Sequence, residues 1–175
     1  MNTEVILVNE KDEAIGTMEK IRAHEEALLH RAYSIFIFND NGEILLHKRS
    51  SHKYHSPGLW TNTCCSHPQP GETTCESANK RLKFEMGIDA PLEKAFDFIY
   101  KAGFDNGLTE HEFDHVYVGK YNGPVEPNKD EVEDYCFKSL KEIHDSILSH
   151  PHKYTEWFKI AFPKLEDYLI NNTVI

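Results

Sequence analysis

Short stretches rich in β-branched and aromatic residues recur along the chain, and turn-forming residues separate them, which is the pattern of β-strands. One stretch, residues 109–119, alternates cleanly between polar and apolar positions. Between two others, the sequence Asn39-Asp-Asn-Gly42 is a strong signal for a hairpin turn. The predicted strands are residues 4–9, 33–38, 43–49, 96–100 and 109–119, and residues 59–67 start as a strand before two prolines follow.

A helical period replaces this pattern at three places. The clearest helix spans residues 73–86, with apolar positions three or four residues apart on one face, and Gly87 supplies its stop. Those apolar positions are Cys75, Ala78, Leu82 and Met86. Two further helices are expected at about residues 140–149 and 155–170, and Pro163 should kink or break the second.

Strands and helices together predict a mixed α/β (α+β) fold: a central mixed β-sheet between helices on both faces, with the site at the edge of the sheet. A chain of 175 residues suits one domain, and no repeat or long linker divides it. We therefore expect residues 1–175 to form a single domain.

Charge and composition exclude several classes of protein. The net charge of −10 argues against nucleic acid or an anionic membrane as the main partner. Four cysteines without a Cys-x-x-Cys motif, no signal peptide and no long apolar run favour a cytoplasmic location. The chain also has no Rossmann fingerprint and no P-loop, so a nucleotide site of either kind has no support.

A pair of carboxylates stands out in the alternating stretch. Glu110 and Glu112 are two residues apart in a predicted strand, so both face the same side, and Asp114 extends the row. A solvent-facing strand is the plainer interpretation and, from spacing alone, the favoured one. The alternative requires a nearby cation, because two close carboxylates do not both ionise cheaply without one.

Three histidines could supply ligands for such a cation. His24 and His30 are six residues apart, which places them about 120° from the same face of a helix. They could share a metal only if the chain bends between them. His67 follows a cysteine pair in a loop between turn residues. Each histidine alone is more often a surface or capping residue, but three with two carboxylates would suit zinc, manganese or iron.

Other reactive residues have ordinary interpretations beside their functional ones. Cys65 could transfer a proton if its pKa is lowered, although a buried thiol is the usual state, and Cys64 would point the opposite way in a strand. Arg81 and Glu85 have the spacing of a surface ion pair on a helix. The remaining candidates, which spacing alone does not distinguish from core or surface residues, are Lys20, Arg49, Lys53 and Trp157.

Four segments resemble the type 1 isopentenyl-diphosphate delta-isomerases of the Nudix-like superfamily. The residues Thr61-Asn-Thr-Cys-Cys-Ser-His-Pro68 resemble the cysteine motif of that family, and Leu108-Thr-Glu-His-Glu112 resembles its acidic motif. Residues 28–39 and 157–160 resemble its first signature and its C-terminal aromatic segment. The four segments lie within residues 20–160, and the cysteine motif is highly specific.

The resemblance also implies a degenerate Nudix box. The residues that match the box are Glu72, Glu85, Gly87 and Ile88. Arg81 and Phe84 stand where diphosphate hydrolases hold metal-binding glutamates, and Ser66 replaces the leading glycine. These losses favour an isomerase over a Nudix-type hydrolase. A non-catalytic protein that binds metal or prenyl diphosphate is the third alternative.

A full set of site residues follows from the resemblance. It implies one zinc or manganese ion held by His24, His30, His67, Glu110 and Glu112. Glu85 and the Cys65 carbonyl would hold a magnesium ion that bridges the substrate's diphosphate. The cations that would contact the diphosphate are Lys20, Arg49, Lys53 and Arg81.

The implied reaction moves the double bond of isopentenyl diphosphate to give dimethylallyl diphosphate. Glu112, helped by Tyr100, would protonate the alkene, and Cys65 would remove the second proton. Trp157 would stabilise the carbocation. No flavin or nicotinamide is needed, and the expected partner is a small prenyl diphosphate, bound by a monomer or weak homodimer.

Overall fold

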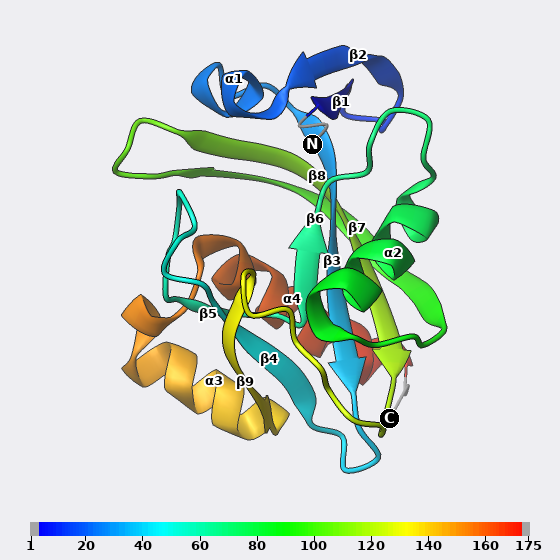
Figure 1. Cartoon of the computed structure of the whole chain (residues 1–175), viewed down its shortest axis with the longest axis vertical. Helices are drawn as coiled ribbons and strands as arrows, with labels where there is room; N and C mark the ends of the chain where they lie inside the picture. The colour runs from blue at the N-terminus through cyan, green and yellow to red at the C-terminus, as the bar shows by residue number, and fades with distance from the viewer. Residues whose placement is uncertain (1–3, 173–175) are drawn as a thin grey trace.

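The computed structural model describes residues 4–172 (Figure 1). Its strands are β1 Glu4–Val8, β2 Ala14–Glu19, β3 His30–Phe38, β4 Ile44–Arg49, β5 Trp60–Thr61, β6 Cys64–Ser66, β7 Leu92–Gly103, β8 Thr109–Lys120 and β9 Val132–Lys138. Its helices are α1 Lys20–Glu25, α2 Thr74–Met86, α3 Leu140–Ser149 and α4 Glu156–Asn172, with a 3-10 turn at Pro151–Lys153. None of the helices within residues 4–172 is long and apolar enough to cross a membrane.

Strand β3 is the centre of a mixed sheet. It pairs in parallel with β8 along its whole length, from His30 opposite Glu112 to Phe38 opposite Lys120. Its other edge pairs antiparallel with β1, β6 and β4 in turn. Beyond β8 lies β7, and β4 pairs with β5 and β9. The predicted mixed sheet is confirmed.

Helices cover both faces of this sheet, as the sequence predicted. Figure 1 shows α2 in front of β3 and β8 and α4 behind them. On the α2 side, Ile35 and Ile37 of β3 belong to the same buried cluster as Leu82. On the α4 side, Phe36 of β3 packs in a cluster with Phe158. Alternate residues of β3 therefore enter two different cores, because successive side chains of a strand point to opposite faces.

Helix α2 begins and ends where its sequence indicates. Thr73 and Glu76 form a reciprocal capping box, and Gly87 ends the helix in the left-handed conformation with φ 66°. A side chain at Gly87 would bring its Cβ within 2.7 Å of the Glu126 carbonyl oxygen, so glycine is required there. One predicted position is wrong, because Cys75 is exposed.

Three other expectations need correction. The pattern missed strands β2 and β9 entirely. Helix α4 runs unbroken through Pro163, so the predicted break does not occur, and its neighbour Phe162 packs in the core on the same turn. The polar residues of β8 are not all exposed, since Asp114 and His115 are both buried by the layers on either face.

Candidate active site

A cavity collects nearly all of the predicted site residues. All of them except His24 and His30 line it, and those two histidines lie against His67 at its wall. The lining residues from the predicted set are Lys20, Arg49, Lys53, Cys65, His67, Arg81, Glu85, Tyr100, Glu110, Glu112 and Trp157. Segments far apart in the sequence therefore converge on one place.

Strand register explains much of this convergence. His30 of β3 lies opposite Glu112 of β8, and Glu112 lies opposite Tyr100 of β7, so the three side chains form a row on one face. On the other side of β3, Cys65 of β6 lies opposite Ser34. The expectation of a site at the edge of the sheet is wrong, because β3 and β8 are interior strands.

The histidines meet because the chain bends between α1 and β3. Helix α1 ends at Glu25, and Ala27 has a left-handed φ of 53° before His30 opens the strand. The ring centroids of His24 and His30 are 5.0 Å apart, and each lies 5.9 Å or less from the His67 ring. One nitrogen from each histidine lies within 4.8 Å of the others. From the sequence, His24 and His30 could share a metal only if the chain bends between them, and the structure contains this bend.

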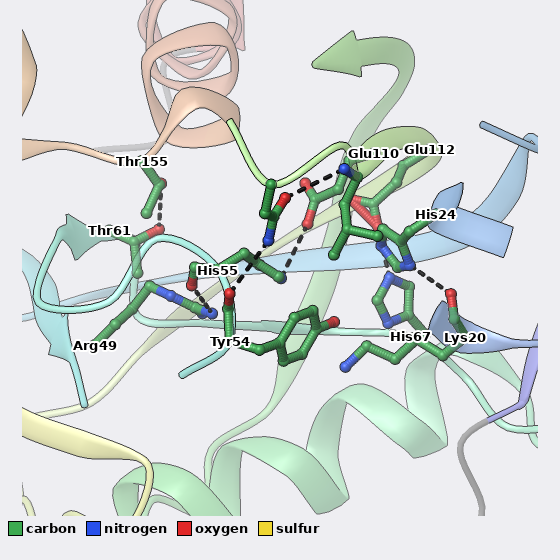
Figure 2. Close-up of polar contacts among 12 residues, drawn as sticks. Lys20, His24, Arg49, Tyr54, His55, Thr61, His67, Glu110, Glu112 and Thr155 are labelled. Atoms are coloured by element: carbon green, nitrogen blue, oxygen red, sulfur yellow. Dashed lines mark hydrogen bonds and ion pairs between the residues drawn. The ribbon is translucent and has the colours of Figure 1, made fainter. Parts of the chain in front are cut away.

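Backbone contacts orient two of these rings toward the cluster. His24 Nδ1 donates to the Lys20 carbonyl at 2.6 Å (Figure 2), and His30 Nδ1 donates to the Leu28 carbonyl at 2.8 Å. The Nε2 atoms of both rings are buried and have no hydrogen-bond partner. Burial also lowers the pKa of His24. Neutral imidazoles with inward lone pairs are the form in which histidine binds metal, so the cluster fits a divalent ion.

The two carboxylates complete the donor set. Glu112 Oε2 lies 2.6 Å from His67 Nε2 and 3.4 Å from His30 Nε2. The Tyr100 hydroxyl donates to Glu110 Oε2 at 2.7 Å and also contacts Glu112. Both glutamates are buried, which makes the solvent-facing interpretation wrong.

Burial acts to raise the pKa of both glutamates, but their neighbours shift the two pKa values in opposite directions. Burial and the charge of Glu112 raise the pKa of Glu110 well above its usual range. Burial also acts to raise the pKa of Glu112, but His67 and His30 outweigh it and lower that pKa well below its usual range. The pKa of Glu110 is thus raised and that of Glu112 lowered, with the Tyr100 hydroxyl between the two carboxylates.

The cysteine pair divides between the two faces of β6, as an extended segment requires. Cys65 lines the cavity, whereas Cys64 is fully buried and donates through Sγ to Glu85 Oε2 at 2.7 Å. The lowered pKa that the sequence set as the condition for a reactive Cys65 is not found in the free chain. Burial raises the pKa of Cys65, and the nearby charge of Arg49 only partly opposes it. Cys65 is therefore a thiol at neutral pH.

A cationic region forms the other end of the cavity. Arg49 is buried, and its NH2 group donates to the His55 carbonyl at 3.2 Å (Figure 2). Burial, followed by neighbouring positive charge, lowers the pKa of Lys20. Lys53 lies in the same region, and burial likewise lowers its pKa. Crowding of positive charge in a low-dielectric cavity is what an anion site requires.

Glu85 lies among these cations. Arg81 Nε is 3.2 Å from Glu85 Oε2, and the glutamate is only 4% exposed, so the surface ion pair expected from their spacing is wrong. Burial acts to raise the pKa of Glu85, but Arg81 and His47 lower it further than burial raises it. An ionised, cavity-lining carboxylate fits a magnesium ion, which proteins bind through one or two carboxylates plus substrate phosphates.

Trp157 is both a core residue and a wall of the cavity. It is 3% exposed and packs with the residues of α4, yet its Nε1 has no hydrogen-bond partner. The guanidinium carbon of Arg49 lies 5.1 Å from the centre of its ring. Arg49 thus already occupies one face of the indole through a cation–π contact.

Sequence reasoning missed His55. Its ring is 8% exposed, stacks on Phe104 at 5.1 Å and approaches Trp157 at 5.7 Å. Its Nε2 lies 3.6 Å from Glu110 Oε1 (Figure 2), and burial lowers the pKa of His55 to about 3. The available signal was its position two residues after Lys53 in a polar loop.

Two other Nudix-box positions, Glu72 and Phe84, do not line the cavity. Glu72 accepts from Lys80 at 3.1 Å and from the Gln69 backbone, and Phe84 is exposed. Along helix α2, all of which is described, Glu85 is the carboxylate that lines the cavity. The carboxylate cluster that a diphosphate hydrolase needs is therefore missing from this helix.

Comparison with curated proteins gives near full-length matches. A profile of the NUDIX domain matches residues 28–158. A Pectobacterium atrosepticum protein named isopentenyl-diphosphate Delta-isomerase is 46% identical and covers 95% of this chain and 93% of the relative. An Aromatoleum aromaticum protein named isopentenyl-diphosphate Delta-isomerase 2 is 45% identical, and the match covers 94% of this chain and 87% of the relative. A Serratia proteamaculans protein, also named isopentenyl-diphosphate Delta-isomerase, is 44% identical, and the match covers 90% of this chain and 88% of the relative.

Solved structures share the fold at low sequence identity. A Deinococcus radiodurans protein matches with a TM-score of 0.76 and 16% identity, over 92% of this chain and 98% of that one. The MutT protein of Methanosarcina mazei matches with a TM-score of 0.66 and 19% identity, over 79% and 94%. At such identities the likeness establishes the fold alone.

Proposed function

The chain belongs to the NUDIX-domain family and, within it, to the isopentenyl-diphosphate Delta-isomerases, and we propose from this that its cavity converts isopentenyl diphosphate to dimethylallyl diphosphate. The observation that carries the proposal is the meeting, in one cavity, of an imidazole–carboxylate cluster, a thiol and a group of cations. The acidic protein thereby gathers positive charge locally for an anionic substrate.

The imidazole–carboxylate cluster would hold one zinc or manganese ion. Its ligands would be His24, His30, His67, Glu110 and Glu112. Such an ion supplies Lewis acidity and fixes the positions of its ligands. Glu85, with the carbonyl oxygen of Cys65, would hold a magnesium ion against the diphosphate. Metal analysis of the purified protein, followed by exhaustive chelation, tests both assignments, since activity that survives chelation would contradict them.

The proton chemistry requires two groups that reach the alkene from different directions. Glu112 comes from the strand on one side of β3, and Cys65 comes from the strand on the other. We assign protonation of the alkene to Glu112 with Tyr100. The proton would pass from Glu110, whose pKa is raised, through the Tyr100 hydroxyl to Glu112, and from Glu112 to the alkene. Because an alkene is a very weak base, the acid must be desolvated and well aimed, and burial provides the first condition.

Cys65 would accept the second proton as a thiolate, its own proton having first passed to bulk water. Arg49 is the charge that favours the thiolate, and a thiolate formed in a buried site is a strong base. Trp157 would face the carbocation while it excludes water from the cavity. The indole and the buried cations also leave little room for a nucleophile to trap the cation.

A Nudix-type hydrolase is the alternative. Two observations count against it: Phe84 is exposed, and Glu72 pairs with Lys80 instead of lining the cavity. A pure binding protein would need neither Cys65 nor the glutamate pair. Proton and phosphorus NMR with isopentenyl diphosphate, magnesium and zinc or manganese in heavy water separates the three. Dimethylallyl diphosphate with deuterium in a methyl group supports the isomerase, released phosphate or monoester supports the hydrolase, and unchanged substrate leaves the binder.

We also propose that residues 1–175 act as one domain, as a monomer or weak homodimer in the cytoplasm. Its four cysteines are free, which suits a reducing compartment. The net charge of −10 is unfavourable for nucleic acid or anionic membranes and favours a small prenyl diphosphate as the partner. Light scattering over a range of concentrations tests the oligomeric state, and a tight dimer would contradict it.

A further inference from the structure

Two cations of the cavity pair with a carboxylate that the proposed function does not use. Glu131 Oε2 contacts Lys53 Nζ and lies 3.2 Å from an Arg81 NH2 nitrogen. The same oxygen therefore bridges two of the four cations assigned to the diphosphate. Its side chain is 20% exposed.

Backbone hydrogen bonds hold Glu131 in this place independently of the cations. The Asn128 N–H donates to the Glu85 carbonyl at 2.8 Å, which fixes the segment on the end of α2. Glu131 donates through its N–H to the Asn128 carbonyl at 3.0 Å and accepts from the Ser50 N–H at 3.1 Å. The carboxylate is thus presented to Lys53 and Arg81 by a turn joined to both flanking segments.

We propose that Glu131 is a specificity-determining residue. Its carboxylate pairs with Lys53 and Arg81 in the free protein, and the substrate's diphosphate takes its place in the complex. This inference rests on the proposed diphosphate site. An incoming anion must take the N–H donors that Glu131 Oε2 holds, and it is repelled by that carboxylate until it does so. A diphosphate has enough charge and oxygen atoms to displace the carboxylate, whereas a single phosphate group gains too little. Glu131 therefore excludes small phosphates from the site.

Calorimetric titration with inorganic diphosphate and inorganic phosphate, in chelator and without divalent metal, tests the inference. Glu131→Gln should bind diphosphate roughly tenfold more tightly than the natural chain. It should gain more for phosphate than for diphosphate, so that the ratio of the two affinities falls. Glu133→Gln is the matched control, because Glu133 pairs with Lys48 at 3.4 Å near the same turn and does not line the cavity.

The sign of the change decides the outcome. Binding that is weaker or unchanged in Glu131→Gln overturns the inference, because a residue that only positions the two cations gives that result. If the natural chain binds no diphosphate and Arg81→Gln makes no difference, the proposed diphosphate site itself fails. Should Glu131→Gln not fold, judged by thermal unfolding, Glu131→Asp replaces it. The shorter side chain of that variant should give a smaller gain of the same sign, and a loss of affinity overturns the inference equally.

Discussion

The histidine cluster and the cationic end of the cavity differ in whether their polar groups have partners within the protein. At the histidine cluster, the Nε2 atoms of His24 and His30 are buried without any hydrogen-bond partner. At the cationic end, every charged group has a contact within the protein. Lys53 and Arg81 share Glu131, Arg49 lies against Trp157, and Lys20 lies 5.0 Å from the Tyr54 ring centre.

The difference follows from the cost of removing each group from water. An unpaired neutral polar group costs about 1–3 kcal/mol when buried, whereas an unpaired ion costs several kcal/mol more. A buried imidazole whose pKa is lowered, such as that of His24, can therefore keep its Nε2 atom unbonded while its Nδ1 atom is hydrogen-bonded. Guanidinium and ammonium groups cannot be buried unpaired at so small a cost. The fold therefore supplies counter-ions or aromatic ring faces, which a ligand must replace.

The largest expected effect comes from breaking the histidine end with Glu112→Gln. The amide loses the charge beside His67 and His30 and cannot transfer a proton, so isomerisation should fall by about 10³-fold or more. Turnover and bound metal should both be measured, and the metal content should fall as well. Glu133→Gln is the control, and near-normal turnover in well-folded Glu112→Gln would contradict the assigned role.

Cys65→Ala should separate proton transfer from metal binding. We expect turnover to fall by about 10²–10⁴-fold while bound metal stays constant, because the proposal assigns the Cys65 side chain to proton transfer and only its carbonyl to an ion. Turnover and metal content of the purified variant are the measurements. Cys75→Ala, at an exposed cysteine, is the matched control and should behave like the natural chain. Equal turnover in the two variants would remove Cys65 from the mechanism.

The pH dependence of stability should reveal the neutral histidines. Burial lowers the pKa of His67 to about 4, so the unfolded chain binds the proton more readily than the folded one. The free energy of unfolding of the metal-free protein is thus highest above about pH 6.5, the unfolded value, and should fall by about 3 kcal/mol toward pH 4.

Urea unfolding in chelator between pH 7.5 and 4.5 measures this slope. His67→Asn should flatten the curve, because it removes the titrating group, whereas a control substitution at the exposed His52 should leave it unchanged. A natural chain whose stability does not change over this range would contradict the buried neutral state.

The smallest effect should come from the cationic end, through Lys53→Gln. Three assigned cations remain, so we expect KM for the prenyl diphosphate to rise roughly tenfold with little change in kcat. Bound metal at the histidine end should not change. Lys48→Gln, outside the cavity, is the control, and an unchanged KM in Lys53→Gln would exclude contact with the diphosphate.

Several elements were predictable because their signals are local. The bounds of α3 match the expected residues 140–149, and α2 follows its capping box and Gly87. Strands β2 and β9 were missed because each lies at the border of the sheet with mostly exposed side chains, which leaves little apolar pattern to detect. The break expected at Pro163 ignored the buried apolar residues on both sides of it.

The sequence by itself determined which residue types are present and in what order. The alternation of strands and helices, the cysteine and acidic motifs and the lost glutamates of α2 could all be identified along the chain. Local propensity and motif spacing depend only on neighbouring residues, which is why these inferences hold.

Tertiary structure decided which groups are buried together, and therefore their chemistry. The pKa values of Glu110 and Glu112 move in opposite directions only because β8 lies between β3 and β7 beside His67. Cys65 kept its proton because it is enclosed, which the sequence left open beside the alternative of a lowered pKa. Glu131 had no sequence signal, since its contacts with Lys53 and Arg81 join segments far apart in the chain. Burial and charge pairing are properties of the folded arrangement, and they set pKa and affinity where spacing cannot.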